Sequence, residues 1–161
     1  MKIKVFMTML AAVAVVVGFS SCGSDDDEPD TALASQVIGS YTGEEVMTVM
    51  GDDSNSTTTY EFTKSSDISV DMTIPPTAGG GPMALPALPV KNITLIKSGN
   101  NITGKVSLYS GTVTNSAGDE KSYTVSDLVA IFNGKAVVVT YVLKYGNMPF
   151  PFVGKFTGTR K

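Results

Sequence analysis

The chain offers few side chains that could carry out catalysis. It contains no histidine and a single cysteine, Cys22, so neither a Ser-His-Asp arrangement nor an imidazole metal site can form. The run Asp52-Asp53-Ser54-Asn55 supplies oxygen atoms of the kind that bind Ca²⁺, but hairpin loops prefer the same residue types. Glycoside cleavage would need two acids facing one interior, and the strand pattern described below supplies at most one. We therefore expect no enzymatic activity, no cofactor and no metal.

The only cysteine follows a segment with the layout of a secretory signal. Lys2 and Lys4 precede an uncharged, apolar-rich stretch at residues 5–19, which ends in small residues. This stretch is shorter than the roughly 20 residues with which a helix crosses a bilayer, and the charges that follow are acidic. We therefore expect residues 1–21 to be a signal peptide that is removed, rather than a membrane-spanning helix.

The residues around the cysteine suggest how the chain is attached to a membrane. Phe19-Ser20-Ser21-Cys22 resembles a lipobox, where bacterial signal peptidase II cuts and the new N-terminal cysteine carries lipid; Phe19 stands where Leu is usual. The alternative is a free thiol, which would be a liability in an oxidising compartment. Acyl chains that insert into a bilayer stabilise membrane attachment by about 0.8 kcal/mol per buried CH₂. We therefore expect Cys22 to be lipidated and the membrane to be a partner.

An acidic segment comes next. Of the 15 acids, five lie in residues 22–32 and ten in 33–161; of the 12 bases, two lie in the leader and ten in 33–161. Such a run is typical of a solvated tether, which we place at 22–36. Directly after a lipidated cysteine, an acidic run resembles the export signal of Bacteroidetes surface lipoproteins. This resemblance implies the outer membrane and favours display at the cell surface over the periplasmic face. The alternative is that the acidic run serves only as an extended linker. Residues 33–161, in which acids and bases are equal in number, contain no cluster of basic residues that could bind nucleic acid.

Residues 37–161 carry the pattern of one β domain. Polar and apolar residues alternate strictly over 67–74, and Asn133-Gly134 suits the type I′ turn of a hairpin. Sequential antiparallel strands without intervening helices favour an all-β, eight-stranded antiparallel up-and-down barrel, since closure removes exposed edges; a two-sheet sandwich is the alternative. The pattern predicts strands at 38–50, 57–64, 67–74, 90–97, 101–114, 121–132, 135–145 and 152–160.

Three short motifs support this architecture: GSYTG (39–43), LPALPVKNI (85–93) and PFPFVGKFTG (149–158). With them the chain resembles the calycin-like β-barrel domains of Bacteroidetes lipoproteins over essentially all of 38–160. The resemblance implies an eight-stranded barrel distantly akin to lipocalins, and no settled activity. Tyr41 stands where the lipocalin signature has Trp, and the chain has no Trp.

Loop lengths predict two different barrel ends. The tight turns 65–66, 98–100 and 133–134 share one end with both chain termini, whereas 51–56, 75–89, 115–120 and 146–151 lie at the other. Apolar residues in these long loops are candidates for a rim that captures a small apolar molecule, a glycan or a protein; alternatively the loops fold back and plug the barrel. The candidate rim residues are Met83, Leu85, Leu88, Met148 and Phe150.

The interior is the second candidate site, with Tyr41, Glu45 and Tyr141 as its candidate residues. Strict alternation places Glu45 inside, where a carboxylate needs a partner or a raised pKa; a kink at Gly43 that turns Glu44 or Glu45 to solvent is the favoured alternative. Inward glycines either leave room for a ligand or relieve strand curvature. A bulge is expected near Asp127. The residues predicted to face inward are Tyr41, Met47, Tyr60, Phe62, Ile68, Val70, Met72, Ile74, Ile93, Leu95, Ile102, Val106, Leu108, Val125, Val139, Tyr141, Leu143, Phe152 and Phe156.

Two functions remain open for such a barrel. The first is a binding module for a small apolar molecule or a glycan, which needs an open cavity beneath 75–89. The second is a structural or interaction protein, such as an accessory or inhibitor subunit, with a filled barrel and contacts through 75–89 and 146–151. An eight-stranded barrel is wide enough either to be filled by its own side chains or to hold one small ligand. A filled interior therefore favours the second function.

Overall fold

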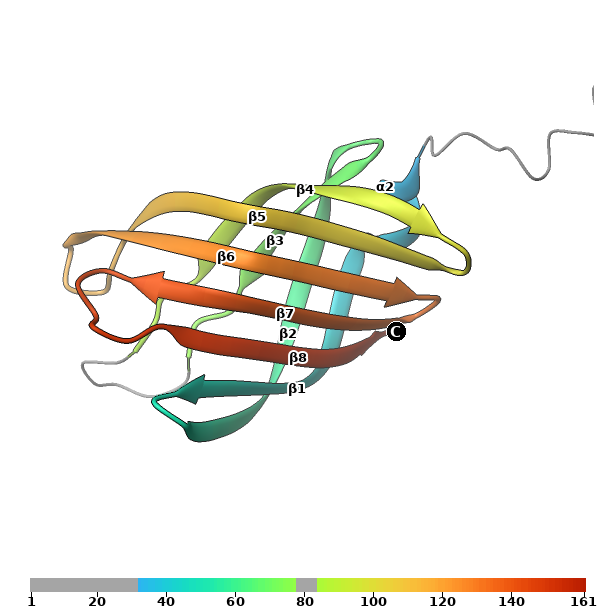
Figure 1. Ribbon diagram of the computed structural model, residues 1–161. Coiled ribbons are helices and arrows are strands. Elements are labelled where there is room, and N and C mark those ends of the chain that lie inside the picture. Colours follow the sequence, from blue (N-terminus) through green and yellow to red (C-terminus); the bar gives the residue numbers. More distant parts are fainter. Residues whose placement is uncertain (1–31, 78–83) are drawn as a thin grey trace, which may run out of the picture. The chain divides into compact units, whose positions relative to one another are not determined.

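The computed structural model describes residues 32–77 and 84–161. Eight antiparallel strands follow one another around a closed barrel, and β1 pairs with both β2 and β8 (Figure 1). The predicted up-and-down barrel is confirmed, and the two-sheet sandwich is excluded. The elements are α2 Leu33–Val37, β1 Gly39–Val49, β2 Asp52–Ser66, β3 Ser69–Ile74, β4 Leu88–Ser98, β5 Asn101–Thr114, β6 Glu120–Asn133, β7 Ala136–Tyr145 and β8 Phe152–Arg160.

The first hairpin differs from the prediction. The segment 51–56 was expected to be a long loop, but β2 begins at Asp52 and pairs with β1 from there on. Met50 and Gly51 have φ values of 56° and 94°, and positive φ at the two central residues of a two-residue turn matches the twist of the strands. The Thr48 hydroxyl also donates to Asp53 Oδ1 at 2.6 Å. The polar residues that suggested a loop therefore extend the hairpin.

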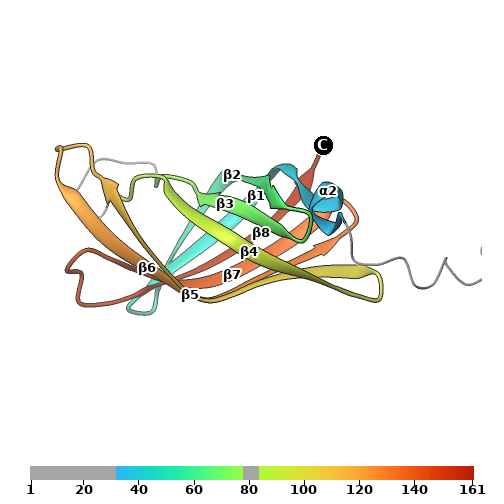
Figure 2. The same ribbon diagram turned by 90° about the horizontal axis from the view of Figure 1, so that it is seen from above.

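The folded part also begins earlier than expected. Residues up to 36 were assigned to the tether, but Leu33, Ala34 and Val37 of helix α2 are buried in the core. The Ala34 amide donates to the carbonyl of Asp67 at 2.9 Å. Helix α2 contacts β2, β3 and β4 and lies at one end of the barrel (Figure 2). Helix α2 was not predicted, because five residues are too few to show the periodicity of a helix in the sequence.

The two barrel ends differ in the predicted way. The short connections β2–β3, β4–β5 and β6–β7 lie at the end that carries α2 and the C-terminus (Figure 1). The connections between β3 and β4, β5 and β6, and β7 and β8 are longer and lie at the opposite end, here called the long-loop end. The exception is the β1–β2 turn, which is tight.

A bulge in β6 changes which residues face the interior. The pairing of β6 with β7 shifts between Ser126 and Val129, and Asp127 has a φ of 51°, so the predicted bulge is confirmed. On the other side of β6, Leu108 pairs with Ser126 and its side chain is 65% exposed. The prediction that Leu108 points inward is therefore wrong, because the bulge changes the phase. Ile68 was also predicted inward, but it precedes β3 and is exposed.

Aromatic rings occupy the interior. The rings of Phe62 and Phe132 lie edge to face with centroids 5.0 Å apart, and Phe156 stacks on Tyr60 at 4.3 Å. Such pairs are stabilising beyond the area they bury. The largest fully buried side chains are Tyr41, Tyr60, Tyr141, Phe62, Phe132, Phe156, Leu33, Met72, Ile74, Leu88, Ile93 and Leu128.

The inward glycines make room for these rings. A Cβ atom at Gly154 would collide with the ring of Tyr141, and one at Gly158 would collide with the ring of Phe156. The space at these two positions is therefore not open to a ligand, one of the two predicted roles for inward glycines. Aromatic side chains of the protein itself fill the space that the missing side chains leave.

Candidate functional site

Glu45 is the buried charged residue of the described core. It lies on β1 between Phe156 of β8 and Ser56 of β2, and only 5% of its surface is exposed. The expected kink at Gly43 is absent, because β1 pairs with both neighbours without a register shift through this position. A Cβ at Gly43 would instead collide with the backbone of β8. Glycine is therefore needed for close strand approach, and regular alternation keeps Glu45 inside.

Two tyrosines hold the Glu45 carboxylate. The hydroxyls of Tyr60 on β2 and Tyr141 on β7 both donate to Glu45 Oε1, the latter at 3.0 Å. The two hydroxyl oxygens are 2.9 Å apart. Glu45 and Tyr141 were both predicted as interior site residues. Tyr60 was predicted to face inward but was not predicted as a site residue. Its alternation with the inward Phe62 is the sequence feature that could have indicated that it belongs to the site.

The protonation states of the two tyrosines suit this role. Burial raises the pKa of Tyr60 well above its usual value, and the neighbouring Tyr141 and the Glu45 carboxylate raise it further. Burial also raises the pKa of Tyr141, with the charge of Glu45 as a second cause. Both hydroxyls therefore stay protonated and act as donors.

This cluster has the character of a structural anchor. A buried carboxylate needs hydrogen-bond partners, and Glu45 has two. These hydrogen bonds offset the free-energy cost of removing the carboxylate from water. The three side chains come from β1, β2 and β7, and their hydrogen bonds fix these strands relative to one another. In the part of the chain that the structure describes, no group of three or more acidic, Cys or His side chains is arranged to hold a metal ion.

Tyr41, the third predicted interior residue, lies apart from Glu45. Its hydroxyl donates to the carbonyl of Val37 at 2.9 Å, and the Arg160 guanidinium lies 5.6 Å from the centre of its ring. Arg160 also donates to the carbonyl of Ile38 at 2.7 Å. Tyr41 thus ties helix α2 to the barrel at the end that carries the C-terminus.

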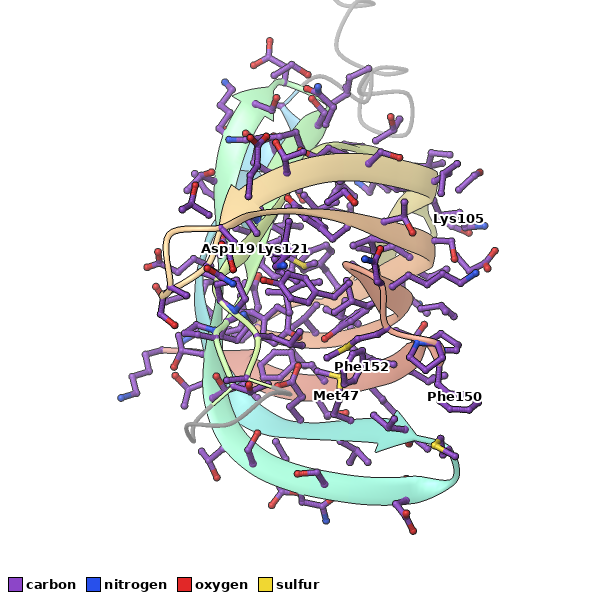
Figure 3. The ribbon with its side chains drawn as sticks, turned by 90° about the vertical axis from the view of Figure 1, so that its left-hand side faces the viewer. Met47, Lys105, Asp119, Lys121, Phe150 and Phe152 are labelled. Atoms are coloured by element: carbon purple, nitrogen blue, oxygen red, sulfur yellow. The ribbon has the colours of Figure 1, made fainter. Side chains whose placement is uncertain are left out.

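The predicted rim residues lie in different environments. Leu85 and Leu88 are buried in the core, and the Leu85 amide and carbonyl both bond Thr77. This part of 75–89 therefore folds back onto the barrel. Met148 is partly buried against the core, whereas Phe150 is 46% exposed (Figure 3). Met83 and Cys22 lie outside the described residues.

Phe150 has an exposed apolar neighbour from another hairpin. Val49 pairs with Phe152, so the β1–β2 turn and the β7–β8 loop are adjacent at the long-loop end. Met50, in that turn, is 70% exposed. Met50 was not predicted as a site residue, since it was assigned to the end of a strand. Viewed from the long-loop end, Met47 and Phe152 lie within the barrel and Phe150 lies at its outside (Figure 3).

A hollow of about 200 Å³ lies on the outer surface, not in the interior. The residues that line it belong to β1 and β2: Glu44, Val46, Asn55, Ser56 and Thr57. The described residues include no helix long and apolar enough to span a membrane.

Together these features define a closed eight-stranded antiparallel β-barrel whose interior is filled by aromatic rings around a buried Glu-Tyr-Tyr cluster. Among solved structures, a Bacteroides fragilis protein described as a "putative outer membrane protein" has a similar fold, with a TM-score of 0.62 and 17% sequence identity. The match covers 81% of this chain and 53% of that protein, so the chain corresponds to about half of it. No protein-family model and no curated protein sequence matches the chain.

Proposed function

We propose that this chain is a non-catalytic, calycin-like outer-membrane lipoprotein, anchored through Cys22, whose filled barrel presents the exposed residues of its long-loop end to a protein partner. The filled interior carries the proposal. A site for a small apolar molecule or a glycan inside the barrel needs open space, and aromatic side chains, six of them among the largest fully buried ones, occupy the interior instead. Space that the protein's own side chains occupy is closed to a ligand.

The exposed apolar residues are the second support. Met50 and Phe150 are large apolar side chains on adjacent loops, and they face water. Clustered exposed apolar side chains mark contact sites more often than single ones do. The contact surface proposed here is therefore the pair Met50 and Phe150, with the half-buried Met148 beside them.

The membrane attachment rests on the lipobox-like residues before Cys22 and on the acidic run after it. The similar fold of the Bacteroides fragilis protein is consistent with an outer-membrane location. Replacement of Cys22 by Ser tests the attachment. We expect the wild-type chain to incorporate labelled palmitate and to fractionate with the outer membrane, and the variant to do neither. A variant that is still labelled contradicts lipidation of Cys22.

Site-specific photocrosslinking in cells tests the contact surface. A photoreactive residue at position 150 is compared with one at 108, since Leu108 is even more exposed but lies on the barrel wall. We expect a crosslinked product heavier than two copies of the chain at position 150 and none at 108. Equal products at both positions would refute a contact specific to the long-loop end. Native mass spectrometry of the protein purified from its own host tests the alternative, because a retained small molecule would restore the ligand-binding function.

A further inference from the structure

One part of the barrel wall gathers positive charge and contains no negative charge. It consists of the halves of β4 to β8 that lie next to the tight turns, in residues 94–105, 129–140 and 155–161, and is here called the basic wall. Residues 33–161 hold ten bases and ten acids. None of those acids and six of those bases belong to the basic wall: Lys97, Lys105, Lys135, Lys155, Arg160 and Lys161.

Strand pairing joins the three segments into one continuous surface. A single row of residues, each paired with the next, crosses all five strands through Thr94, Lys105, Val129, Thr140 and Lys155. The acids Glu44, which pairs with Thr157, and Asp127, in the β6 bulge, lie at the borders of this surface. Because the cations are scattered along the sequence, only the closed barrel brings them to one side.

The cations of the basic wall are not neutralised by acids of the described chain. None of the six forms an ion pair with a residue that the structure describes, whereas three of the other four bases, Lys64, Lys91 and Lys121, each pair with an aspartate. Arg160 donates to the carbonyl of Ile38. The lysines of the basic wall are exposed, so their charge is available to an anion outside the barrel.

A row of exposed apolar side chains crosses the same surface. Ile131 pairs with Val138 on one side and with Thr103 on the other, and Thr103 pairs with Ile96. The exposed fractions of Ile96, Ile131 and Val138 are 55%, 41% and 36%. Apolar side chains flanked by lysines are typical of surfaces that bind at a membrane interface, where the apolar groups enter the headgroup region and the lysines contact anionic lipids.

We propose that the basic wall binds the surface of an anionic lipid bilayer. A bilayer presents negative headgroups with an apolar layer beneath them, so it matches both the lysines and the apolar row, whereas the phosphates of a nucleic acid match only the charge. The wall is convex, but fluid lipids rearrange around a convex surface. The row from Ile96 to Val138 crosses only three strand spacings, about 14 Å.

The anchor proposed above acts at the same end of the barrel, and this step rests on that proposed function. The ten residues 23–32 between Cys22 and helix α2 span at most about 35 Å. Helix α2 lies at the tight-turn end (Figure 1), so a lipid on Cys22 would hold the basic wall near the bilayer and raise the effective concentration of a weak contact. Four acids lie in the hairpins of the opposite end: Asp52, Asp53, Asp119 and Glu120. Repulsion of these acids by anionic lipid directs the long-loop end away from the membrane.

Vesicle binding of the unlipidated chain tests the basic wall. Residues 23–161, which include the whole described barrel, are mixed with phosphatidylcholine vesicles that contain about 30% phosphatidylglycerol, in about 0.1 M salt. We expect the wild type to sediment with these vesicles, to dissociate as salt is added, and not to bind vesicles of phosphatidylcholine alone. Lys97→Gln and Lys135→Gln should each lower the partition constant about three- to fivefold. Circular dichroism verifies that each variant is folded.

Lys144→Gln is the matched control for charge. Lys144 is an exposed lysine near the long-loop end of β7, and its replacement removes the same charge outside the basic wall. Because the Debye length in about 0.1 M salt is about 10 Å, the partition constant should stay within about twofold of the wild type.

A fluorescent label tests the apolar row separately. Cys22 is the only cysteine, so residues 23–161 accept a single labelled cysteine. We compare Ile131→Cys with Leu108→Cys, since Leu108 is exposed on the same barrel but outside the basic wall. An environment-sensitive fluorophore at position 131 should shift its emission to the blue when the anionic vesicles are added, and one at position 108 should not.

Four results would overturn the proposal. They are a wild-type chain that does not bind the anionic vesicles, equal binding to both kinds of vesicle, an effect of Lys144→Gln as large as that of Lys135→Gln, and equal emission shifts at positions 131 and 108. None of these measurements involves Cys22, Met50 or Phe150. Failure here therefore leaves the proposed lipidation and the long-loop contact standing, and an unlipidated Cys22 leaves the vesicle results unchanged.

Discussion

Tyr141 and Gly154 lie opposite each other on β7 and β8, and the Tyr141 ring occupies the space that a Cβ atom on residue 154 would need. We predict that Gly154→Ala destabilises the protein by about 1–3 kcal/mol, because a core that is already packed must shift to accept the methyl group. Tyr141→Leu opens that space. The two changes together should cost at least about 1 kcal/mol less than their sum. Urea unfolding measures all four proteins, and strictly additive losses would contradict the packing relationship.

The second prediction concerns the Glu45 carboxylate. Glu45→Leu removes the acceptor that Tyr60 and Tyr141 share, so we expect a loss of about 1–3 kcal/mol in the free energy of unfolding. Glu45→Gln keeps an oxygen acceptor and should cost less. Combining Glu45→Leu with Tyr60→Phe and Tyr141→Phe removes donors and acceptor together, so the triple variant should be more stable than the sum of the single losses indicates. A Glu45→Leu protein as stable as the wild type would refute the anchoring role.

The third prediction concerns alkaline pH. Burial raises the pKa of Tyr60 and of Tyr141, whereas in the unfolded chain a tyrosine titrates near 10. Below about pH 10 both states hold these protons and the stability is fully present. Above it the unfolded chain releases protons that the native chain keeps, so stability falls by about 1.4 kcal/mol per pH unit for each tyrosine until the native pKa is reached.

Tyrosinate absorbance and circular dichroism, followed together as the pH rises, check this prediction. We expect the ionisation of the buried tyrosines to coincide with the loss of β structure. The Tyr60→Phe and Tyr141→Phe variants should lose stability with a shallower pH slope than the wild type. Ionisation of both hydroxyls while the native spectrum persists would show that they are not held as buried donors.

The fourth prediction concerns the bulge in β6. Asp127 has a φ of 51°, a conformation that Asp tolerates and β-branched residues do not. We expect Asp127→Val to lower the free energy of unfolding by about 1–2 kcal/mol and Asp127→Gly to change it by less than about 0.5 kcal/mol. Ser126→Val, one residue away and outside the left-handed region, is the matched control. Equal effects at 126 and 127 would show that the backbone conformation is not the cause.

Local patterns in the sequence determined the class of fold. Alternation over 67–74, the Asn133-Gly134 turn and the phase change before Leu128 predicted strands, a hairpin and a bulge that the structure contains. These features depend on the chemistry of a few consecutive residues, because side-chain direction alternates with a period of two and turns need particular backbone angles. The same alternation placed Glu45 in the interior, although a kink at Gly43 was the favoured interpretation.

Only the tertiary structure decided what the interior contains. Tyr60 and Tyr141 are separated by 81 residues, and Tyr141 and Glu45 by 96, so no local pattern indicates that their oxygens meet. Closure of the barrel and the register of its strands bring these oxygens together. The same register places the Tyr141 ring in the space that a side chain at Gly154 would occupy. The same closure joins Lys155 to Val46 across β8 and β1. The sequence by itself determined an eight-stranded barrel, and the long-range pairing of its strands decided that aromatic rings fill it.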